Sequence, residues 1–254
     1  MSDENNKNAV LSFLNLSDEY ERRARLLPAA LSILVLMPMA IAFGVPLLEW
    51  VTTLLAGVGL GAVLALGISH LASAMGNRLQ RVLWPNWPHD APTHRWLHPG
   101  DANRSKQQKE QWYAAIHRLT GLDIAATSAA GDQAEVDRVI NDAVTTMRTK
   151  LWKTPQADLV RVRNVEYGYA RNLTGLRLLW LAGAIASCVG SWVAYWCFTG
   201  TLLWPVVSTA LVLLLPFLAF LVLPGYVRQK ADYYAEGFFG ALMELDQGGR
   251  GVGA

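Results

Sequence analysis

The sequence predicts an all-α integral membrane protein with four transmembrane helices, arranged as two hairpins, and a small helical cytosolic domain. First, residues 26–48, 50–76 and 178–227 contain no Asp, Glu, Lys or Arg, and a helix needs about 20 apolar residues to cross a bilayer. Second, every Lys and Arg lies outside these stretches. Because basic residues near spans stay on the cytoplasmic side, we expect both termini and the middle segment in the cytoplasm, and the chain in an inner membrane.

The charge pattern divides the chain into five segments. The expected segments are an N-terminal cytosolic or interfacial helix (1–25), a first hairpin (26–73), a cytosolic helical domain (74–175), a second hairpin (176–224), and a C-terminal cytosolic helix and tail (225–254). The hairpins should turn at Gly44–Pro46 and near Thr199–Pro205, since Gly and Pro stop a helix. Only 17% of the residues are charged, against about a quarter in soluble domains.

The cytosolic domain begins with a segment rich in Pro, Trp and His. Its four prolines, between Trp84 and Asp101, preclude a continuous helix. Apolar residues then recur at helical spacing over residues 105–119 and 132–153, which predicts two helices. Such a small domain buries only a modest core alone, so we expect the membrane, the tails or neighbouring subunits to complete it.

Two further segments are expected to be helical. Residues 159–165 alternate in the manner of a strand, but they lead directly into the third apolar stretch. We therefore favour a helix or helix–turn–helix over residues 158–177, with Gly168 and Gly175 as places where it can bend. Residues 226–245 follow Pro224 and Gly225 and carry an aromatic face, which predicts a separate cytosolic helix.

The Pro-rich segment contains three histidines, His89, His94 and His98. His94 and His98 have the i, i+4 spacing that zinc sites use, but prolines flank them and neither a cysteine ligand nor an H-E-x-x-H motif is present. We expect no metal and no cofactor. The tryptophans of the same segment (Trp84, Trp87 and Trp96) indicate instead that it lies along the lipid head groups, where Trp is enriched.

The spans contain no Asp, Glu, Lys or Arg at mid-depth, which argues against a proton-coupled transporter. Small residues recur at helix-packing spacing in Gly57 and Gly61 and in a ridge of Gly183, Ser187 and Ser191. The pattern is typical of close helix packing, and the alternative is that the ridge lines a pore. Glu49 is the single charge expected on the outer side; it is either a solvated turn residue or part of a carboxylate ring at a pore mouth.

A basic string precedes the third span. Its candidate contacts to a ligand or to lipid phosphates are Arg161, Arg163, Arg171, Asn172 and Arg177. The alternative is a packed membrane entry whose basic residues anchor it at the interface.

The string RNVEYGYARNLTGLR (163–177) resembles a pattern in uncharacterised bacterial four-span membrane proteins, some of which accompany phage-defence genes. The matching residues are Asn164, Tyr167, Gly168, Tyr169, Arg171, Asn172, Leu173, Gly175 and Arg177. THRWLHPGD and KEQWYAAIHRLTG extend the resemblance to Thr93–Arg177. Tyr169 stands where the family has Phe, and Ala170 where it has a basic residue. The resemblance implies a four-span membrane protein and carries no activity with it.

We expect a membrane effector: a homo-oligomer in the lipid bilayer that opens a pore or perturbs the membrane when its cytosolic part senses a nucleotide or a partner protein, as in antiphage defence. The alternative is a non-conducting anchor or scaffold that recruits a cytosolic partner. A lipid-modifying enzyme would have only His89, His94 and Asp101 to use, and no catalytic motif is present, so we expect no enzyme. The formal net charge of +2 is too small to predict duplex nucleic acid as a partner.

Overall fold

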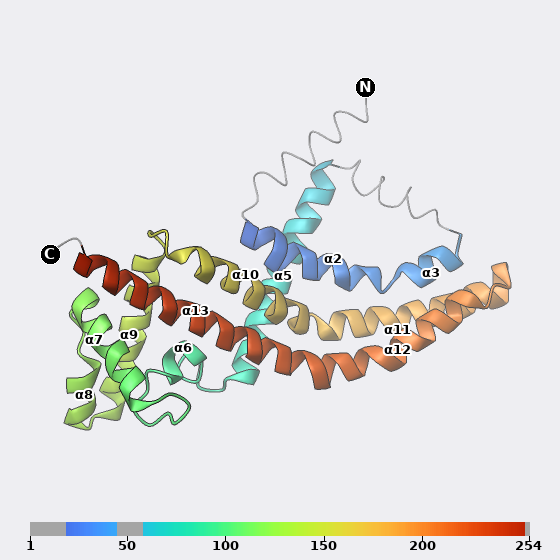
Figure 1. Cartoon of the computed structure of the whole chain (residues 1–254). Coiled ribbons are helices and arrows are strands. Elements are labelled where there is room, and N and C mark those ends of the chain that lie inside the picture. The colour runs from blue at the N-terminus through green and yellow to red at the C-terminus, as the bar shows by residue number, and fades with distance from the viewer. Residues whose placement is uncertain (1–18, 45–57, 252–254) are drawn as a thin grey trace. The chain divides into compact units, whose positions relative to one another are not determined.

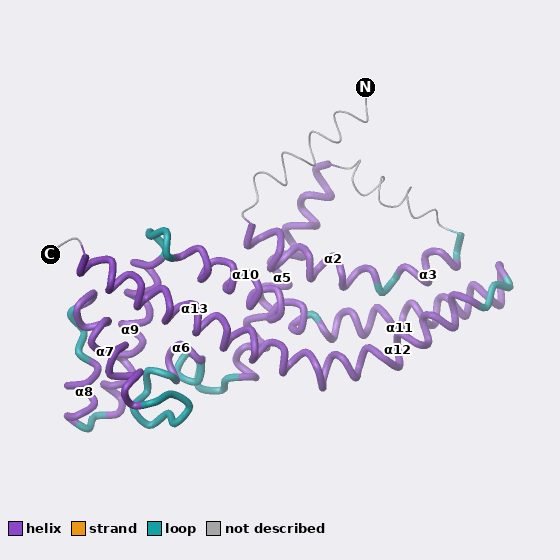
Figure 2. The backbone as a smooth tube through the Cα atoms, viewed as in Figure 1, coloured by secondary structure: helices purple, strands orange, loops and turns teal. Residues whose placement is uncertain are grey.

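The computed structural model describes residues 19–44 and 58–251, and all regular structure in these ranges is helical (Figure 2). The expected helical fold class is confirmed for this part of the chain. In order, the elements, with η for wider π-helical turns, are η1 (Glu21–Leu26), α2 (Leu27–Leu34), α3 (Met37–Ala42), α5 (Val58–Leu83), α6 (Pro92–Arg95), α7 (Lys106–Thr120), α8 (Ile124–Ala130), α9 (Gln133–Leu151), α10 (Ala157–Gly175), α11 (Arg177–Ala194), η2 (Tyr195–Thr199), α12 (Leu203–Phe217), η3 (Leu218–Val222) and α13 (Leu223–Gly251).

The chain divides into two compact units. We call residues 1–79 and 168–227 the apolar unit, and residues 80–167 and 228–254 the polar unit. The polar unit therefore combines the middle segment of the chain with its C-terminal helix. Helices α5, α10 and α13 each contain the point at which the chain passes from one unit to the other.

Helix α11 is the centre of the apolar unit, where it packs against α2, α3 and α12 (Figure 1). Small residues allow the close approach: a Cβ on Gly183 would lie 2.9 Å from Val35 Cγ2, and one on Gly190 would lie 2.4 Å from Met39 Sδ. Without a side chain in the way, helices in an apolar medium gain van der Waals contact along their whole length.

Helices α5 and α10 also meet through glycine. A Cβ on Gly175 would lie 2.6 Å from the backbone nitrogen of Gly76, so the two backbones are in direct contact. One turn earlier, Asn172 is fully buried and donates from Nδ2 to the carbonyl oxygen of Ala24 at 2.7 Å. This hydrogen bond joins the residues that lead into the third apolar stretch to those that precede the first.

Prolines change two expected spans. The first apolar stretch is not one helix within the described residues: α2 ends at Leu34 and α3 begins at Met37, because Pro38 cannot donate a hydrogen bond back to Leu34. Conversely, the expectation that the helix ends at Pro224 and Gly225 is wrong. Helical structure continues from α12 through η3 into α13, and the wider turn of η3, in which Leu223 N–H bonds to the Leu218 carbonyl, gives room for the ring of Pro224.

The surface of the helical segments from α11 to η3 is apolar. Trp196 (76% exposed), Phe198, Leu213 (75%) and Leu221 all present large side chains to the outside. Two helical stretches, Arg177–Phe198 and Leu203–Gly248, are long and apolar enough to cross a membrane, and only 28% and 11% of their most apolar windows are buried. A core helix of a soluble protein is mostly buried, so this pattern weakly favours a membrane location for these two helices.

The polar unit has an ordinary helical core. It contains buried residues of α7, α9 and α13, including Ile116, Ile140, Met147, Phe238 and Leu242. Helix α7 matches the prediction for residues 105–119, and α9 matches that for residues 132–153. The sequence signals for both starts are N-caps: Ser105 Oγ accepts from the backbone of Gln108, and the Asp132 carboxylate accepts from Ala134 and Glu135.

Residues 157–175 form a helix, as favoured for the ambiguous segment, and the strand-like alternation has no counterpart in the structure. A break at Leu176 separates α10 from α11, directly after Gly175. The chain passes through Gly168 without a break, and a Cβ there would lie 2.7 Å from the Tyr20 hydroxyl. Of the two places where a bend was possible, Gly168 is therefore not used: this glycine makes room for a neighbouring side chain.

Candidate functional site

The Pro-rich segment and α13 build a pocket inside the polar unit. Helix α5 ends at Leu83, and Pro85 prevents its continuation beyond Trp84. The following chain folds back because the Asp90 carboxylate accepts the backbone N–H of Asn86 at 2.9 Å. Helix α6 then carries Arg95, while α13 contributes Arg228 and Asp232, which are four residues apart and share one helix face.

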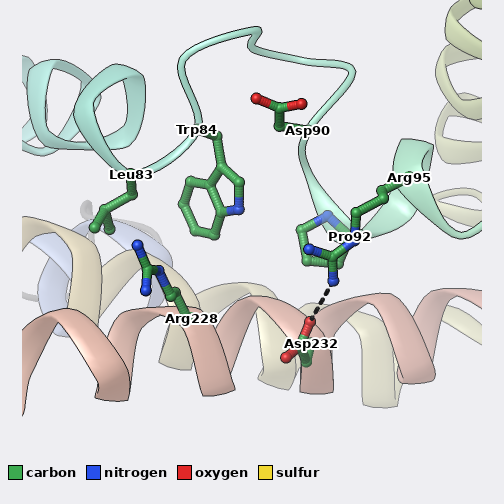
Figure 3. Close-up of a pocket in the computed structure, with 7 residues that line it drawn as sticks. All are labelled: Leu83, Trp84, Asp90, Pro92, Arg95, Arg228 and Asp232. Atoms are coloured by element: carbon green, nitrogen blue, oxygen red, sulfur yellow. Dashed lines mark ion pairs between the residues drawn. The ribbon is translucent and has the colours of Figure 1, made fainter. Parts of the chain in front are cut away.

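The pocket has a volume of about 350 Å³, which is within the range of small-molecule sites. Its lining consists of Leu83, Trp84, Asp90, Pro92, Arg95, Arg228 and Asp232 (Figure 3). Three of these residues are apolar and four carry a charge. This mixture fits a small ligand that has an apolar or planar part and at least one charged group.

One side of the pocket is internally neutralised. Arg95 pairs with Asp101, with Nε and Oδ2 3.3 Å apart, and reaches Asp232 at 3.9 Å across the pocket (Figure 3). Burial raises the pKa of Asp232 above its usual value, while Arg95 and Arg104 act in the opposite direction. Arg95 therefore compensates two carboxylates and has little capacity left for a ligand anion.

The loop that carries these groups is held by a buried ammonium. Lys109 of α7 is 5% exposed and donates to the carbonyl oxygens of His98, Pro99 and Asp101. Burial lowers the pKa of Lys109. Because three backbone carbonyls converge on one donor, the chain between α6 and α7 has a defined path, and so does the carboxylate of Asp101 that positions Arg95.

Arg228 differs from the other charged residues of the pocket. Its side chain is exposed, and within the described ranges it has neither a hydrogen bond nor an ion pair. Figure 3 shows its guanidinium directed from α13 towards Leu83 and Trp84, on the side of the pocket opposite Asp90. An uncompensated guanidinium beside an apolar wall is a binding position for an anionic group.

The three histidines lie close together in sequence but differ in environment. His94 is buried, contacts the Thr93 hydroxyl at 3.1 Å, and has its pKa lowered to about 4, mainly by burial. His89 lies edge-on to it, with ring centroids 6.4 Å apart, whereas His98 contacts Gln133. Across residues 19–44 and 58–251, no three His, Cys, Asp or Glu side chains gather as metal ligands.

The tryptophans of the segment also separate. The expectation that all three lie among lipid head groups is wrong for Trp96, which is 3% exposed and stacks on Trp112 and Phe239 in the core of the polar unit. Trp84 is buried beside the pocket, and Trp87 is 42% exposed. Burial of a large ring in a protein core outweighs the interfacial preference that the sequence pattern indicates.

The basic string 161–177 is mostly used within the protein. In the polar unit, Arg161 pairs with Asp158 at 2.8 Å and Arg163 with Glu166 at 3.1 Å. Lys230 joins the same carboxylate at 2.9 Å, and these hydrogen bonds lower the pKa of Glu166. Arg161 and Arg163 are therefore already neutralised, and the structure adds no support for a ligand phosphate at either of them.

The other three candidates of that string lie in the apolar unit. Asn172 is a packing residue between helices, as its buried hydrogen bond to Ala24 indicates. Arg171 donates to the Asn172 side chain at 3.2 Å, and Arg177 lies over the ring of Phe220 at 5.0 Å. This environment favours the alternative reading, a packed helix entry with basic anchors.

The small-residue ridge of α11 faces its own chain. Ser187 and Ser191 are both fully buried; Ser187 Oγ accepts the backbone N–H of Met39 at 3.3 Å, and Ser191 donates to the Ser187 carbonyl. With Gly183 against α2, the ridge serves packing within one chain. Gly61 lies in α5, whereas Glu49 and Gly57 lie outside the described residues.

Comparison with known proteins adds no relative from which a role could be transferred. No family model, curated protein or solved structure matches this chain. The functional argument therefore rests on the chain's own residues. Sequence reasoning missed the pocket, although one signal was available: Arg228 is the first charged residue after the uncharged stretch 178–227.

Proposed function

We propose that this chain is a four-span integral membrane protein that acts as an effector, changing membrane permeability when its polar unit binds a signal. The observation that carries the proposal is the combination of apolar helices with exposed apolar surfaces and a separate polar unit that contains a ligand-sized pocket. The resemblance of residues 93–177 to four-span membrane proteins, some of which accompany phage-defence genes, supports the proposed four spans.

The membrane location is supported by the surface of the apolar unit. Residues such as Trp196 and Leu213 expose about three quarters of their surface, and burying such side chains stabilises each by roughly 1.5–3 kcal/mol. The uncharged stretches 26–48 and 50–76 supply the other two proposed spans. With four spans, the positive-inside rule puts the polar unit and both termini in the cytoplasm.

The effector role is supported by the helical connections. The chain passes from the apolar to the polar unit within α5, α10 and α13, never within a flexible loop. We propose that ligand binding beside α13 acts on the apolar helices through these helical segments of the chain.

Topology is tested by cysteine labelling in whole cells. In a background with Cys188→Ser and Cys197→Ser, Thr201→Cys should react with a membrane-impermeant maleimide in intact cells. Ser128→Cys, on α8, should react only after permeabilisation. Labelling of both positions in intact cells, or of neither, would contradict the proposed arrangement.

Effector activity is tested in vesicles. The purified chain, reconstituted at several protein-to-lipid ratios, should release a trapped fluorescent dye or dissipate a potassium gradient faster in the presence of its signal than in its absence. Protein-free vesicles provide the baseline. Correct topology together with no flux, in any oligomeric state and with any candidate nucleotide or short-chain lipid, would refute the effector role.

One observation favours a second candidate, a non-conducting anchor or scaffold. The most conspicuous small-polar ridge, at Ser187 and Ser191, is buried within one chain and does not supply a pore wall. The anchor predicts no flux, together with specific association of the full-length chain with one cytosolic protein. Replacing the apolar spans by unrelated ones should then leave that association unchanged.

A further inference from the structure

We infer that the pocket of the polar unit binds a phosphate group that is carried on an apolar or planar body, with Arg228 as the phosphate ligand. The guanidinium of Arg228 lines the pocket and, within residues 19–44 and 58–251, has no protein partner. Arginine presents its N–H groups in a planar fork that matches two oxygens of a phosphate. None of the basic residues in the string 161–177 lines this site.

The other charges leave the phosphate only one position. Arg95 is committed to Asp101 and Asp232. The Asp90 carboxylate already accepts a backbone N–H and lies across the pocket from Arg228 (Figure 3). An anion bound at Arg228 therefore lies away from the Asp90 carboxylate. Its pairing with the Arg228 guanidinium breaks no existing ion pair.

The rest of the pocket determines what carries the phosphate. Leu83, Trp84 and Pro92 form the apolar part of the lining. They suit the glycerol and first acyl carbons of a phospholipid, and they equally suit the flat face of a nucleoside base. A bare inorganic phosphate would leave this wall without contacts, so it should bind more weakly than either.

Position along the chain favours a phospholipid as the source, and this preference rests on the proposed membrane location. Arg228 directly follows the uncharged stretch that ends at Val227. Leu83 is seven residues (83 − 76) beyond Gly76, the end of another such stretch, or about 10 Å along a helix. Both residues then lie at the depth of the inner-leaflet phosphates, where basic residues attract anionic lipids.

The test is a binding titration of the full-length chain in a non-ionic detergent. The probes are dihexanoyl phosphatidylglycerol, adenosine monophosphate and inorganic phosphate, and binding is followed by calorimetry. The variant is Arg228→Gln, and the matched control is Arg81→Gln, which removes another exposed arginine of the polar unit that has no partner among the described residues and does not line the pocket. Arg228→Lys tests whether the charge alone suffices.

We expect the wild type to bind phosphatidylglycerol more tightly than inorganic phosphate. Arg228→Gln should weaken binding about tenfold or more, as loss of a charge-assisted contact does. Arg81→Gln should change it less than twofold, and Arg228→Lys should be intermediate. Tight binding of adenosine monophosphate in place of the lipid would assign the same site to a free nucleotide.

Two outcomes would overturn the inference: no probe binds at millimolar concentration, or Arg228→Gln and Arg81→Gln weaken binding equally, which is the behaviour of a diffuse basic surface. Circular dichroism of each variant excludes misfolding, and should Arg228→Gln misfold, Arg228→Lys is compared with Arg81→Lys in its place. Because binding is measured in detergent, a failure here is distinct from a failure of vesicle flux, and either can occur without the other.

Discussion

Replacing Gly175 by alanine should loosen the contact between α5 and α10 in the apolar unit. The new Cβ would lie 2.6 Å from Gly76 N, 2.7 Å from Met75 C and 2.8 Å from Gly76 Cα. All three are backbone atoms, so no side chain can rotate away. The only relief is a displacement of one helix relative to the other.

The size of the effect follows from these distances. Non-bonded carbon atoms are comfortable at about 3.5–4.0 Å, so the helices must separate by about 1 Å. Overpacking of this kind costs about 1–3 kcal/mol. The same separation lengthens the buried hydrogen bond from Asn172 to Ala24, now 2.7 Å, whose loss adds about 1 kcal/mol. The free energy of unfolding should therefore fall by about 2–4 kcal/mol.

The assay is denaturant unfolding of the purified chain in detergent, followed by circular dichroism. Gly67→Ala is the matched control: this glycine lies in α5, and a Cβ there would have nothing within 4 Å. The control should be neutral or more stable by up to about 1 kcal/mol, from helix propensity. Equal stability of Gly175→Ala and Gly67→Ala would refute the proposed backbone contact.

Three further predictions concern the polar unit. Trp112→Ala should lower the free energy of unfolding by about 3–5 kcal/mol, since Trp112 is 4% exposed. The measurement is a denaturant titration. The control Trp152→Ala removes a ring that is 39% exposed and should have a much smaller effect. Tyr113→Phe should cost about 1 kcal/mol, because the hydroxyl donates to the Leu97 carbonyl oxygen at 2.5 Å, and unchanged stability would contradict that hydrogen bond. Burial lowers the pKa of His94 from 6.5 to about 4, so the unfolded chain binds the proton more readily, and stability should be lost as the pH falls from about 6.5 towards 4. The free energy of unfolding should fall by up to about 3 kcal/mol over this pH range. The His94→Gln variant should lose less stability over the same range. Parallel plots of stability against pH for the wild type and the variant would exclude a buried neutral His94 ring.

Local signals made the helices of the polar unit predictable. Ser105 and Asp132 satisfy the first free N–H groups of α7 and α9, and such caps depend on residues only a few positions apart. The small helix α8 was missed, although Asp123 caps it in the same way. The continuous helix through Pro224 could not be expected, because the preceding π-helical turn that makes room for the ring has no short sequence signature.

The candidate site was the least predictable part. Arg161, Arg163 and Arg228 are equivalent in the sequence, since each is a basic residue near an uncharged stretch. Only tertiary contacts show that Arg161 and Arg163 pair with Asp158 and Glu166, while Arg228 lines a pocket without a partner of its own among the described residues. Whether a charge is compensated depends on its neighbours in space, which sequence spacing does not reveal.

The helical class, the uncharged stretches and the starts of the main helices in the polar unit could all be predicted from the amino-acid sequence. These properties follow from composition and from interactions within one or two helical turns. The tertiary structure alone decided that Trp96 is a core residue, that Ser187 and Ser191 pack within the chain, and that Leu83, Trp84 and Arg228 share a pocket. Each of these depends on contacts between residues far apart in the chain, because burial and charge compensation are properties of the packed molecule.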